Sequence, residues 1–279
     1  MTIYPIIFSV GPLQITGYGI MMMIGFLIGG WLIGQELKRR GWKEDYAGEI
    51  VVAAVIGGIV GAKVWYAILM QDAGALFSRG GMVWYGGFLG GALGVYLNGL
   101  RLKVPTRWTA QLVASPLAAA YALGRVGCFL VNDDYGRPTD VAWGMKFPQG
   151  LPPSTAGNME RLFGIAMPEG MAPTTVLAVH PTQLYEVTVM LAAFAVLWML
   201  RRRVAGTGWL FGLYLVFAGT ERFLVEFLRA KDDRFFGPFT VAQVTSVALV
   251  LAGAYIWATL YRQKEVDPGP YLNEEPTQA

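Results

Sequence analysis

A basic residue and two neighbouring acidic residues lie close together in GRVGCFLVNDDYGRP, the segment from Gly124 to Pro138. Arg125 lies near the end of a long apolar run, and Asp133 and Asp134 follow after the second glycine. A guanidinium keeps its proton in any protein environment, and placing it in hydrocarbon costs at least ~2.5 kcal/mol. Arg125 should therefore face a partner or a wet cavity, where a guanidinium can hold a phosphate or a carboxylate. The simpler alternative is a snorkelling arginine that only anchors a helix end.

A second group of charged residues lies nearer the C-terminus. Arg222, Glu226 and Arg229 stand at positions i, i+4 and i+7, on one face of a helix, where the glutamate can pair with either arginine. A structural ion pair explains Glu226 as well as a catalytic role does, but it explains Arg222 less well.

The stretch HPTQLYE, from His180 to Glu186, forms a third polar group. Pro181 suits the first turn of a helix, and Gln183 and Glu186 then fall on one side of that helix. His180 alone is more often a hydrogen-bonded surface residue than a catalyst.

Glycines recur at every fourth position in the stretch GGFLGGALG, which begins at Gly86. Such a smooth stripe most often allows two helices to pack closely. Gly86 and Gly87 have a second use open to them, since backbone N–H groups near a helix start can bind a phosphate.

The composition is that of a polytopic membrane protein. Of the 279 residues, 54% are hydrophobic and 15% are charged, against ~25% charged in soluble domains. The single cysteine, Cys128, excludes an internal disulfide and a thiolate metal cluster, and the single histidine argues against a His-based metal site. We expect no cofactor, no metal and no nucleic-acid partner. The first residues lack the basic region and cleavage site of a removable signal peptide.

Seven apolar segments are long enough to cross a ~30 Å hydrocarbon core as helices. We expect them at about residues 16–36, 46–70, 82–100, 108–131, 180–200, 206–228 and 239–261. The Pro- and Gly-rich segment 132–179 lacks helical periodicity and is too long for a tight loop, so we expect a small external head there. The predicted fold is all-α, a single membrane domain over residues 1–279 with seven transmembrane helices and this insertion.

The basic residues predict the orientation. Twelve of the 22 Lys and Arg residues follow the first, third, fifth and seventh segments: Lys38, Arg39, Arg40, Lys43, Arg101, Lys103, Arg107, Arg201, Arg202, Arg203, Arg262 and Lys264. By the positive-inside rule these loops are cytoplasmic, so the N-terminus and the head face outward and the C-terminus faces inward. The outer loop 229–236 is a mild exception with three basic residues, partly balanced by two aspartates.

This orientation brings polar residues from six helices to one depth near the outer face. They are Tyr18, Lys63, Tyr85, Arg125, His180, Gln183, Glu186, Glu221, Arg222 and Glu226. Independent snorkelling explains Arg229 well, but it explains poorly those residues that have apolar neighbours between them and water. We therefore favour a shared polar cavity that opens to the outer face.

In this order and on this topology, the motifs resemble those of the bacterial phosphatidylglycerol–prolipoprotein diacylglyceryl transferases over essentially the whole chain. The resemblance rests on YGIM from Tyr18, GGFLGG from Gly86, GRVGCF with DDYGR up to Arg137, HPTQLYE from His180 and ERFLVEFLR from Glu221. It implies an inner-membrane enzyme that moves a diacylglyceryl group from phosphatidylglycerol to the lipobox cysteine of a prolipoprotein. A thioether then forms at the glycerol carbon and glycerol 1-phosphate leaves.

The resemblance also implies roles for individual residues. The family's essential arginines fall on Arg125 and Arg222, and its essential tyrosine falls on Tyr18. The substrate-binding positions implied by the motifs are Arg125, Gly86, Gly87, Cys128, Gly136, His180, Gln183 and Glu186. The active site would face the periplasm, and we expect the enzyme to work as a monomer.

Three positions depart from the family pattern. Tyr85 stands where the family has a histidine before two glycines, Cys128 replaces an asparagine, and Asp133 replaces a glutamate. The usual histidine base is therefore missing, and a paralogue with altered substrate choice remains open.

The reaction itself indicates what the side chains must do. Releasing a phosphate monoester requires stabilisation of charge on the leaving oxygens, which we assign to Arg125 and Arg222. The incoming thiol has a pKa near ~8.5, and cationic surroundings alone can lower it. If a base acts, Asp133 or Glu226 comes first and His180 next. Tyr85 is a poor base but a plausible donor.

Two other classes of function remain open. A transporter with an outer anion site would show two matching halves, and we find no convincing internal repeat. A non-catalytic relative that binds lipid or signal peptide would fit the residues at positions 85 and 128.

Overall fold

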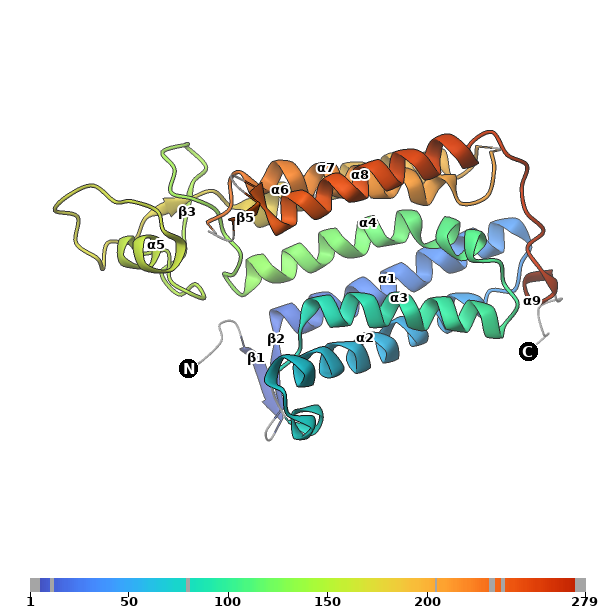
Figure 1. Ribbon diagram of the computed structural model, residues 1–279, viewed down its shortest axis with the longest axis horizontal. Coiled ribbons are helices and arrows are strands. Elements are labelled where there is room, and N and C mark those ends of the chain that lie inside the picture. Colours follow the sequence, from blue (N-terminus) through green and yellow to red (C-terminus); the bar gives the residue numbers. More distant parts are fainter. Residues whose placement is uncertain are drawn as a thin grey trace.

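The computed structural model describes residues 6–10, 13–78, 81–203, 205–230, 234–236 and 239–273, which form a helical bundle with a small head at one end (Figure 1). The long helices are α1 (Gly17–Arg40), α2 (Tyr46–Met70), α3 (Trp84–Arg101), α4 (Thr106–Leu130), α6 (Thr182–Leu200), α7 (Trp209–Glu226) and α8 (Val241–Leu260). Each lies within a few residues of a predicted segment. The prediction of an all-α chain built on these segments is confirmed.

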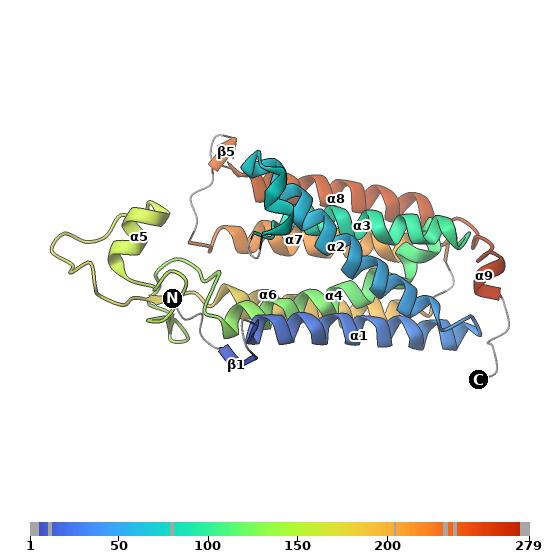
Figure 2. The same cartoon turned by 90° about the horizontal axis from the view of Figure 1, so that it is seen from below.

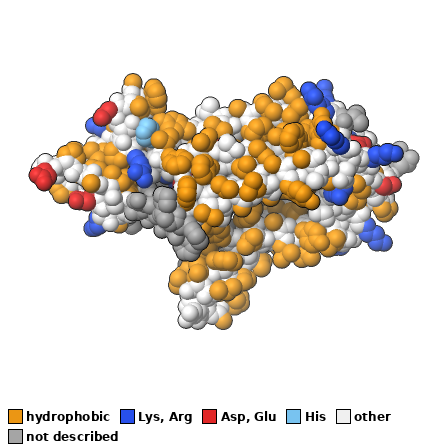
Figure 3. All heavy atoms as spheres, turned by 45° about the horizontal axis from the view of Figure 1, so that its top comes forward, with side chains coloured by type: hydrophobic (Ala, Val, Ile, Leu, Met, Phe, Trp, Pro, Cys, Tyr) orange, Lys and Arg blue, Asp and Glu red, His pale blue; other side chains and the backbone are white. Residues whose placement is uncertain are grey.

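Five of these helices, namely α1, α2, α4, α6 and α8, are long and apolar enough to cross a membrane. Helices α3 and α7 have 18 residues each, and α7 carries three charged residues near its end. Figure 3 shows hydrophobic side chains over the middle of the molecule and a group of Lys and Arg at the end away from the head. This distribution is that of an integral membrane protein; the seven-span arrangement and its orientation stay predictions.

Helix α4 lies in the middle of the bundle and packs against α1 on one side and against α6 and α7 on the other (Figures 1 and 2). Its buried face includes the small residues Ala114, Ala118 and Ala122, which let neighbouring helices come close. The end of α4 nearest the head carries Arg125, so the most central helix also places the residue from which the chemistry was predicted.

Helices α2 and α3 pack against each other through their glycines. A Cβ atom added at Gly61 would lie 2.2 Å from the carbonyl oxygen of Gly86, and one at Gly90 would lie 2.3 Å from the carbonyl oxygen of Gly57. The two backbones therefore touch without intervening side chains, and any larger residue would separate the helices. The predicted packing role of the glycine stripe is confirmed, and Gly86 is part of that contact.

The end of the bundle away from the head is fixed by a buried carboxylate. Glu36 accepts hydrogen bonds from Arg39 at 2.6 and 2.8 Å and from Arg40 at 2.8 Å, and it lies 3.2 Å from the Nε of Arg201 at the end of α6. Only 6% of Glu36 is exposed, so its burial depends on these positive charges. The contact links the ends of α1 and α6.

Several short elements were not predicted. A hairpin of β1 (Ile6–Val10) and β2 (Leu13–Thr16) precedes α1, and a 3-10 helix, η1 (Ala73–Phe77), follows α2. Strands β5 (Arg234–Phe236) and β6 (Phe239–Thr240) precede α8, and α9 (Pro270–Asn273) follows it. These elements are too short for an apolar period to show in the sequence.

The segment 132–179 contains one helix, α5 (Ala156–Phe163), and a strand pair, β3 (Met145–Lys146) with β4 (Ala178–Val179). The sequence did not predict this helix, because the segment shows no helical periodicity. At eight residues, α5 is too short to show periodicity, and it is defined by its ends: the Thr155 side chain caps its start, and Gly164, at φ 64°, ends it.

The head is attached through a narrow stem, in which residues 136–139 pair with residues 178–180. Gly136 N–H donates to the carbonyl of His180 at 2.8 Å, His180 N–H donates to the carbonyl of Arg137 at 3.0 Å, and Thr139 N–H donates to the carbonyl of Ala178 at 3.0 Å. Arg137 N–H also donates to the carbonyl of Leu228 at 2.8 Å, just beyond α7. The stem is thereby held to the end of the bundle.

Candidate active site

Arg125 is bound by acidic residues from two other parts of the chain. Its Nη1 donates to Asp134 Oδ2 at 2.8 Å, and its Nε pairs with Glu186 Oε2 on α6. The hydroxyl of Tyr121, one turn earlier on α4, lies 3.4 Å from Nε and 2.7 Å from the same Glu186 oxygen. Glu186 has no exposed surface. Arg125 is therefore a partly buried residue that is paired with acidic side chains, which argues against the snorkelling alternative.

Asp134 connects Arg125 to a second arginine. Its Oδ1 lies 2.5 Å from Arg229 Nη2. Arg229 is only 8% exposed, so the expectation that it snorkels to the surface is wrong. Burial opposes ionisation of the Asp134 carboxyl, but the charges of Arg229 and Arg125 outweigh it and lower its pKa to about 2. Asp134 is an anion at any physiological pH.

Arg222 joins the same group through Glu226. Arg222 Nη2 lies 2.7 Å from Glu226 Oε2, and that oxygen lies 3.8 Å from Arg229 Nε. The predicted pairing of this glutamate with either arginine is confirmed. We call Arg125, Asp134, Glu186, Arg222, Glu226 and Arg229 the arginine cluster. It connects Arg125 on α4 to Arg222 on α7 through alternating charges.

Two N–H groups of the arginine cluster have no hydrogen-bond acceptor among the described residues. They belong to Arg222 Nη1 and Arg229 Nε, and both atoms are buried. A buried guanidinium donor without an acceptor costs about 1–3 kcal/mol. The arginine cluster can therefore bind an anion. A phosphate or a carboxylate suits it, because each matches the planar fork of N–H donors on a guanidinium.

Asp133 is held beside the arginine cluster but is in none of its ion pairs. Its Oδ1 accepts from the Asp134 N–H at 2.7 Å, and its carbonyl accepts from the side chain of Gln183. Burial, and then the charge of neighbouring Asp134, raise the pKa of the Asp133 carboxyl. Two adjacent carboxyl groups thus have opposite electrostatic environments, because only one of them meets the guanidinium groups.

Gly136 and His180 position the loop that carries Asp134. A Cβ atom at Gly136 would lie 2.5 Å from the carbonyl oxygen of Leu228 and 2.8 Å from Cβ of His180, so only glycine fits. The ring Nδ1 of His180 lies 3.1 Å from the hydroxyl of Tyr185, which also accepts from Trp143 Nε1 at 2.7 Å. These contacts brace the stem of the head against α6.

Of the other predicted site residues, Cys128 lies beside Arg125, whereas Tyr85, Gly86 and Gly87 lie on α3, which contributes no group to the arginine cluster. Tyr18, in the first turn of α1, packs on Gly127, where an added Cβ would lie 3.1 Å from the tyrosine ring. Cys128 Sγ lies 3.8 Å from Arg125 Nη1. Tyr85 is half exposed in the first turn of α3, and Gly86 and the adjoining Gly87 face α2. The acidic and basic groups of the arginine cluster come from α4, α6, α7 and the segments that follow α4 and α7.

Sequence reasoning missed the roles of Asp134, Tyr121 and Glu221. Tyr121 precedes Arg125 by four residues, a spacing that places both on one helix face and could have found it. Asp134 adopts φ 61°, and Asn132 adopts φ 58°. These left-handed conformations turn Asp134 back towards Arg125, and helical periodicity carries no signal for them. Glu221, at 2% exposure, lies 3.4 Å from the Tyr121 hydroxyl.

Comparison with known proteins identifies the family. The family described as prolipoprotein diacylglyceryl transferase matches residues 5–259. Similar proteins include the phosphatidylglycerol–prolipoprotein diacylglyceryl transferases of Pseudoalteromonas atlantica (30% identical, covering 95% of this chain and 92% of the relative) and Clostridium tetani (30%, covering 91% and 96%). The protein of the same name from Vibrio cholerae is 30% identical and covers 93% of this chain and 92% of its own length.

Proposed function

The chain belongs to the prolipoprotein diacylglyceryl transferase family, and from that premise we propose that its arginine cluster is the place where a diacylglyceryl group passes from phosphatidylglycerol to the cysteine of a prolipoprotein. The observation that supports this location is the linkage of Arg125 to Arg229 through Asp134, with Arg222 following through Glu226. Three guanidinium groups from two helix ends meet at one place, an arrangement suited to a phosphate.

The reaction breaks one bond and forms one. The cysteine sulfur attacks the glycerol carbon that bears the phosphate, a C–S bond forms, and the C–O bond to the phosphate breaks. The electron pair of that bond stays with the oxygen, so glycerol 1-phosphate leaves with increased negative charge. Arg125 and Arg222 stabilise this charge in a site with little water, where preorganised donors contribute most. Arg222 Nη1 and Arg229 Nε, which have no hydrogen-bond acceptor among the described residues, are suited to the leaving oxygens.

Asp133 is the carboxyl group best placed to take the proton of the thiol. Glu226 is already held in a 2.7 Å ion pair with Arg222. Asp133 has a raised pKa and lies next to Asp134, which contacts Arg125. A carboxyl group with a raised pKa is a better proton acceptor near neutral pH than one that is paired with a guanidinium.

We predict that Asp133→Asn slows transfer by about 100-fold at pH 6.5 and by less than about tenfold at pH 8.5. The thiol ionises unaided as the pH approaches its own pKa of ~8.5, so the base matters less there. Rates with a lipobox peptide, measured from pH 6 to 9, would show this. Asp133→Glu should restore the wild-type profile. A deficit in Asp133→Asn that is the same at every pH would assign Asp133 to structure only.

The proposal includes a placement in the membrane. Seven helices span the bacterial inner membrane, the head and the arginine cluster face the periplasm, and the basic end around Arg39, Arg40 and Arg201 faces the cytoplasm. The excess of Lys and Arg at the end opposite the head supports this direction (Figure 3). A monomer suffices for this proposal, because one chain supplies a complete arginine cluster.

A direct assay tests the function. The purified chain is incubated in detergent with phosphatidylglycerol and a peptide that carries a lipobox cysteine, and mass spectrometry follows the peptide. We expect a mass increase of one diacylglyceryl group and release of glycerol phosphate. A peptide with serine in place of cysteine should stay unmodified. If lipid and peptide bind without transfer, the chain is a non-catalytic relative, as its unusual Tyr85 and Cys128 would allow.

A further inference from the structure

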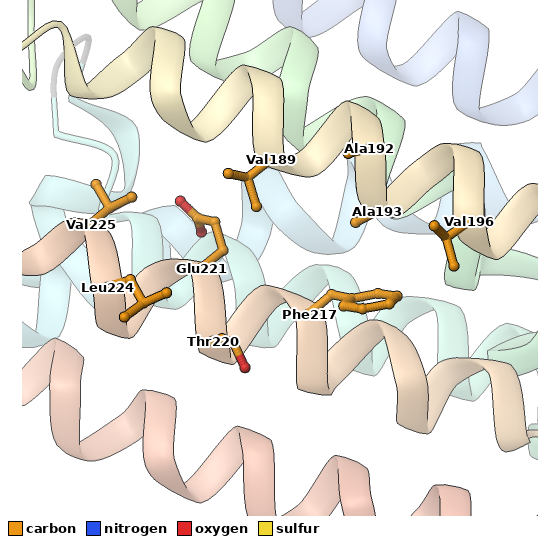
Figure 4. Close-up of a pocket in the computed structure, with 9 residues that line it drawn as sticks. All are labelled: Val189, Ala192, Ala193, Val196, Phe217, Thr220, Glu221, Leu224 and Val225. Carbon is orange, nitrogen blue, oxygen red and sulfur yellow. The ribbon is translucent and has the colours of Figure 1, made fainter.

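Two hollows in the bundle differ in character. The first, between α6 and α7, is lined almost entirely by hydrophobic side chains (Figure 4). The second has a volume of about 330 Å³ and lies between the ends of α1 and α6 that are farthest from the head. None of the described residues that line it is acidic. We call it the basic pocket, after the tryptophans and cations in its wall: Trp31, Lys38, Arg39, Trp198, Arg201 and Arg202.

The positive charge of the basic pocket exceeds the negative charge that contacts it. Glu36 pairs with Arg39 and with Arg201, and it is shared with Arg40, which lies outside the pocket. Lys38 and Arg202 form no ion pair with any residue that the structure describes. A single carboxylate therefore faces the four cations of the pocket, and such an excess of charge attracts an anion.

Arg201 is held in place among like charges. Its guanidinium lies over the Trp198 ring, with Cζ 3.4 Å from the ring centroid, and its Nη1 donates to the Trp198 carbonyl. Burial lowers the pKa of this guanidinium, the Glu36 carboxylate opposes that shift, and the charges of Arg202 and Arg39 lower the pKa further. A bound anion relieves this repulsion and meets a guanidinium that is already oriented.

Apolar stripes on α1 and α6 lead along the bundle to the basic pocket. Their members recur every three or four residues, so that they share a helix face: Met23, Leu27 and Trp31 on α1, and Leu191, Ala195 and Trp198 on α6. Met23 and Leu27 are more than half exposed, on a surface that a bilayer would cover. Lys38 follows Trp31 by two turns, and Arg202 follows Trp198 by one turn.

This order of side chains matches the order of groups in a phospholipid. Acyl chains lie against apolar surface, tryptophan is enriched at the membrane–water interface, and Lys and Arg beyond that level attract anionic headgroups. A zwitterionic headgroup carries a cation of its own, which the four positive charges repel. The basic pocket therefore discriminates in favour of an anionic phospholipid.

We propose that the basic pocket is a second lipid site, in which Lys38, Arg201 and Arg202 bind the phosphate of an anionic phospholipid while its chains lie along the two apolar stripes. This inference goes beyond the proposed function, because it concerns the end of the bundle opposite Arg125 and needs no transfer reaction. The lipid lies in the leaflet away from the head. It joins α1 to α6 at the level where Glu36 also links them.

The test counts bound lipids by native mass spectrometry of the purified full chain in detergent. The probe is dioleoyl phosphatidic acid, which has a phosphate headgroup and lacks the second glycerol of phosphatidylglycerol. Lys38→Gln with Arg202→Gln should bind it at the pocket about 25-fold more weakly, at roughly fivefold for each cation lost. At lipid concentrations that load the wild type, this variant should carry one phosphatidic acid fewer per chain. Lys38→Arg with Arg202→Lys keeps both charges and should bind as the wild type does.

A matched control removes the same charge from the same end of the bundle. Arg203→Gln with Arg262→Gln changes two exposed cations outside the pocket and should leave the number of bound lipids unchanged. Dioleoyl phosphatidylcholine should bind equally to the wild type and to every variant. An equal loss of phosphatidic acid in both Gln pairs would overturn the proposal, because net charge alone would then attract the lipid. Displacement of the lipid by an equal concentration of sodium phosphate would also overturn it, because the apolar stripes would then contribute nothing.

Discussion

Replacing Arg125 by Ala is expected to lower kcat/KM for diacylglyceryl transfer by on the order of 10³-fold. Arg125 donates to Asp134 at 2.8 Å and pairs with Glu186, so its guanidinium is held in place before the lipid arrives. A preorganised charge of this kind stabilises the leaving phosphate without reorganisation during the reaction. Lys at this position carries the charge but cannot contact both acidic partners from separate nitrogens, so Arg125→Lys should lose about 100-fold.

The loss must be separated from misfolding, because Arg125→Ala leaves Glu186 buried without its closest cation. The double variant Arg125→Ala with Glu186→Gln removes that unpaired charge and should regain thermal stability while staying inactive. Arg161→Ala, in the exposed part of α5, is a matched control and should be fully active. Transfer to a lipobox peptide and the melting temperature in detergent are the two measurements. If the Arg125→Ala enzyme keeps more than a tenth of the wild-type activity, the arginine cluster is not the active site.

Asp134→Asn should be nearly as damaging, with a loss of about 100-fold in kcat/KM and a lower melting temperature. Its two oxygens bind Arg125 at 2.8 Å and Arg229 at 2.5 Å, and an amide offers one acceptor while turning N–H donors towards a guanidinium. The two arginines would move apart. Asp140→Asn, an exposed change in the same segment, serves as the control and should have no effect.

The pH dependence of stability gives a second readout for Asp134. Its pKa in the folded chain, about 2, lies below the value near 4 expected for an unfolded aspartate. The ion pairs of Asp134 therefore stabilise the fold fully above about pH 4, and this contribution is lost as the pH falls from about 4 towards 2. The difference in melting temperature between wild type and Asp134→Asn should be constant from pH 5 to 8 and should shrink below pH 4. A difference that persists at pH 2 would show that Asp134 acts through packing.

Much of the fold could be predicted from the sequence, because long apolar segments and basic loops are strong signals in a membrane protein. The helix bounds agree within a few residues, and the i, i+4 spacing predicted the pairing of Arg222 with Glu226. The glycine stripe predicted close packing, which the contact of Gly61 with Gly86 confirms. Each of these signals depends on the regular spacing of residues close together in the chain, so it can be recognised from the sequence alone.

The parts that sequence reasoning missed depend on irregular backbone. It gave Asp134 no role, whereas the left-handed conformation of Asp134 directs that side chain to Arg125 and Arg229. It interpreted Arg229 as a surface anchor because the residue follows the end of a helix, whereas the loop after α4 covers it. Which of two adjacent carboxyl groups meets a cation is decided by tertiary contacts, and their spacing along the chain cannot show it.

The head and the arginine cluster are joined by more than the paired stem. Residues 136–139 and 178–180 bond to each other and to Leu228, and Phe147 and Met159 of the head share a buried apolar cluster with Tyr135 and Ala230. Tyr135 and Ala230 directly follow Asp134 and Arg229, which are paired with each other. A change in the core of the head is therefore transmitted to the pair that connects the arginines.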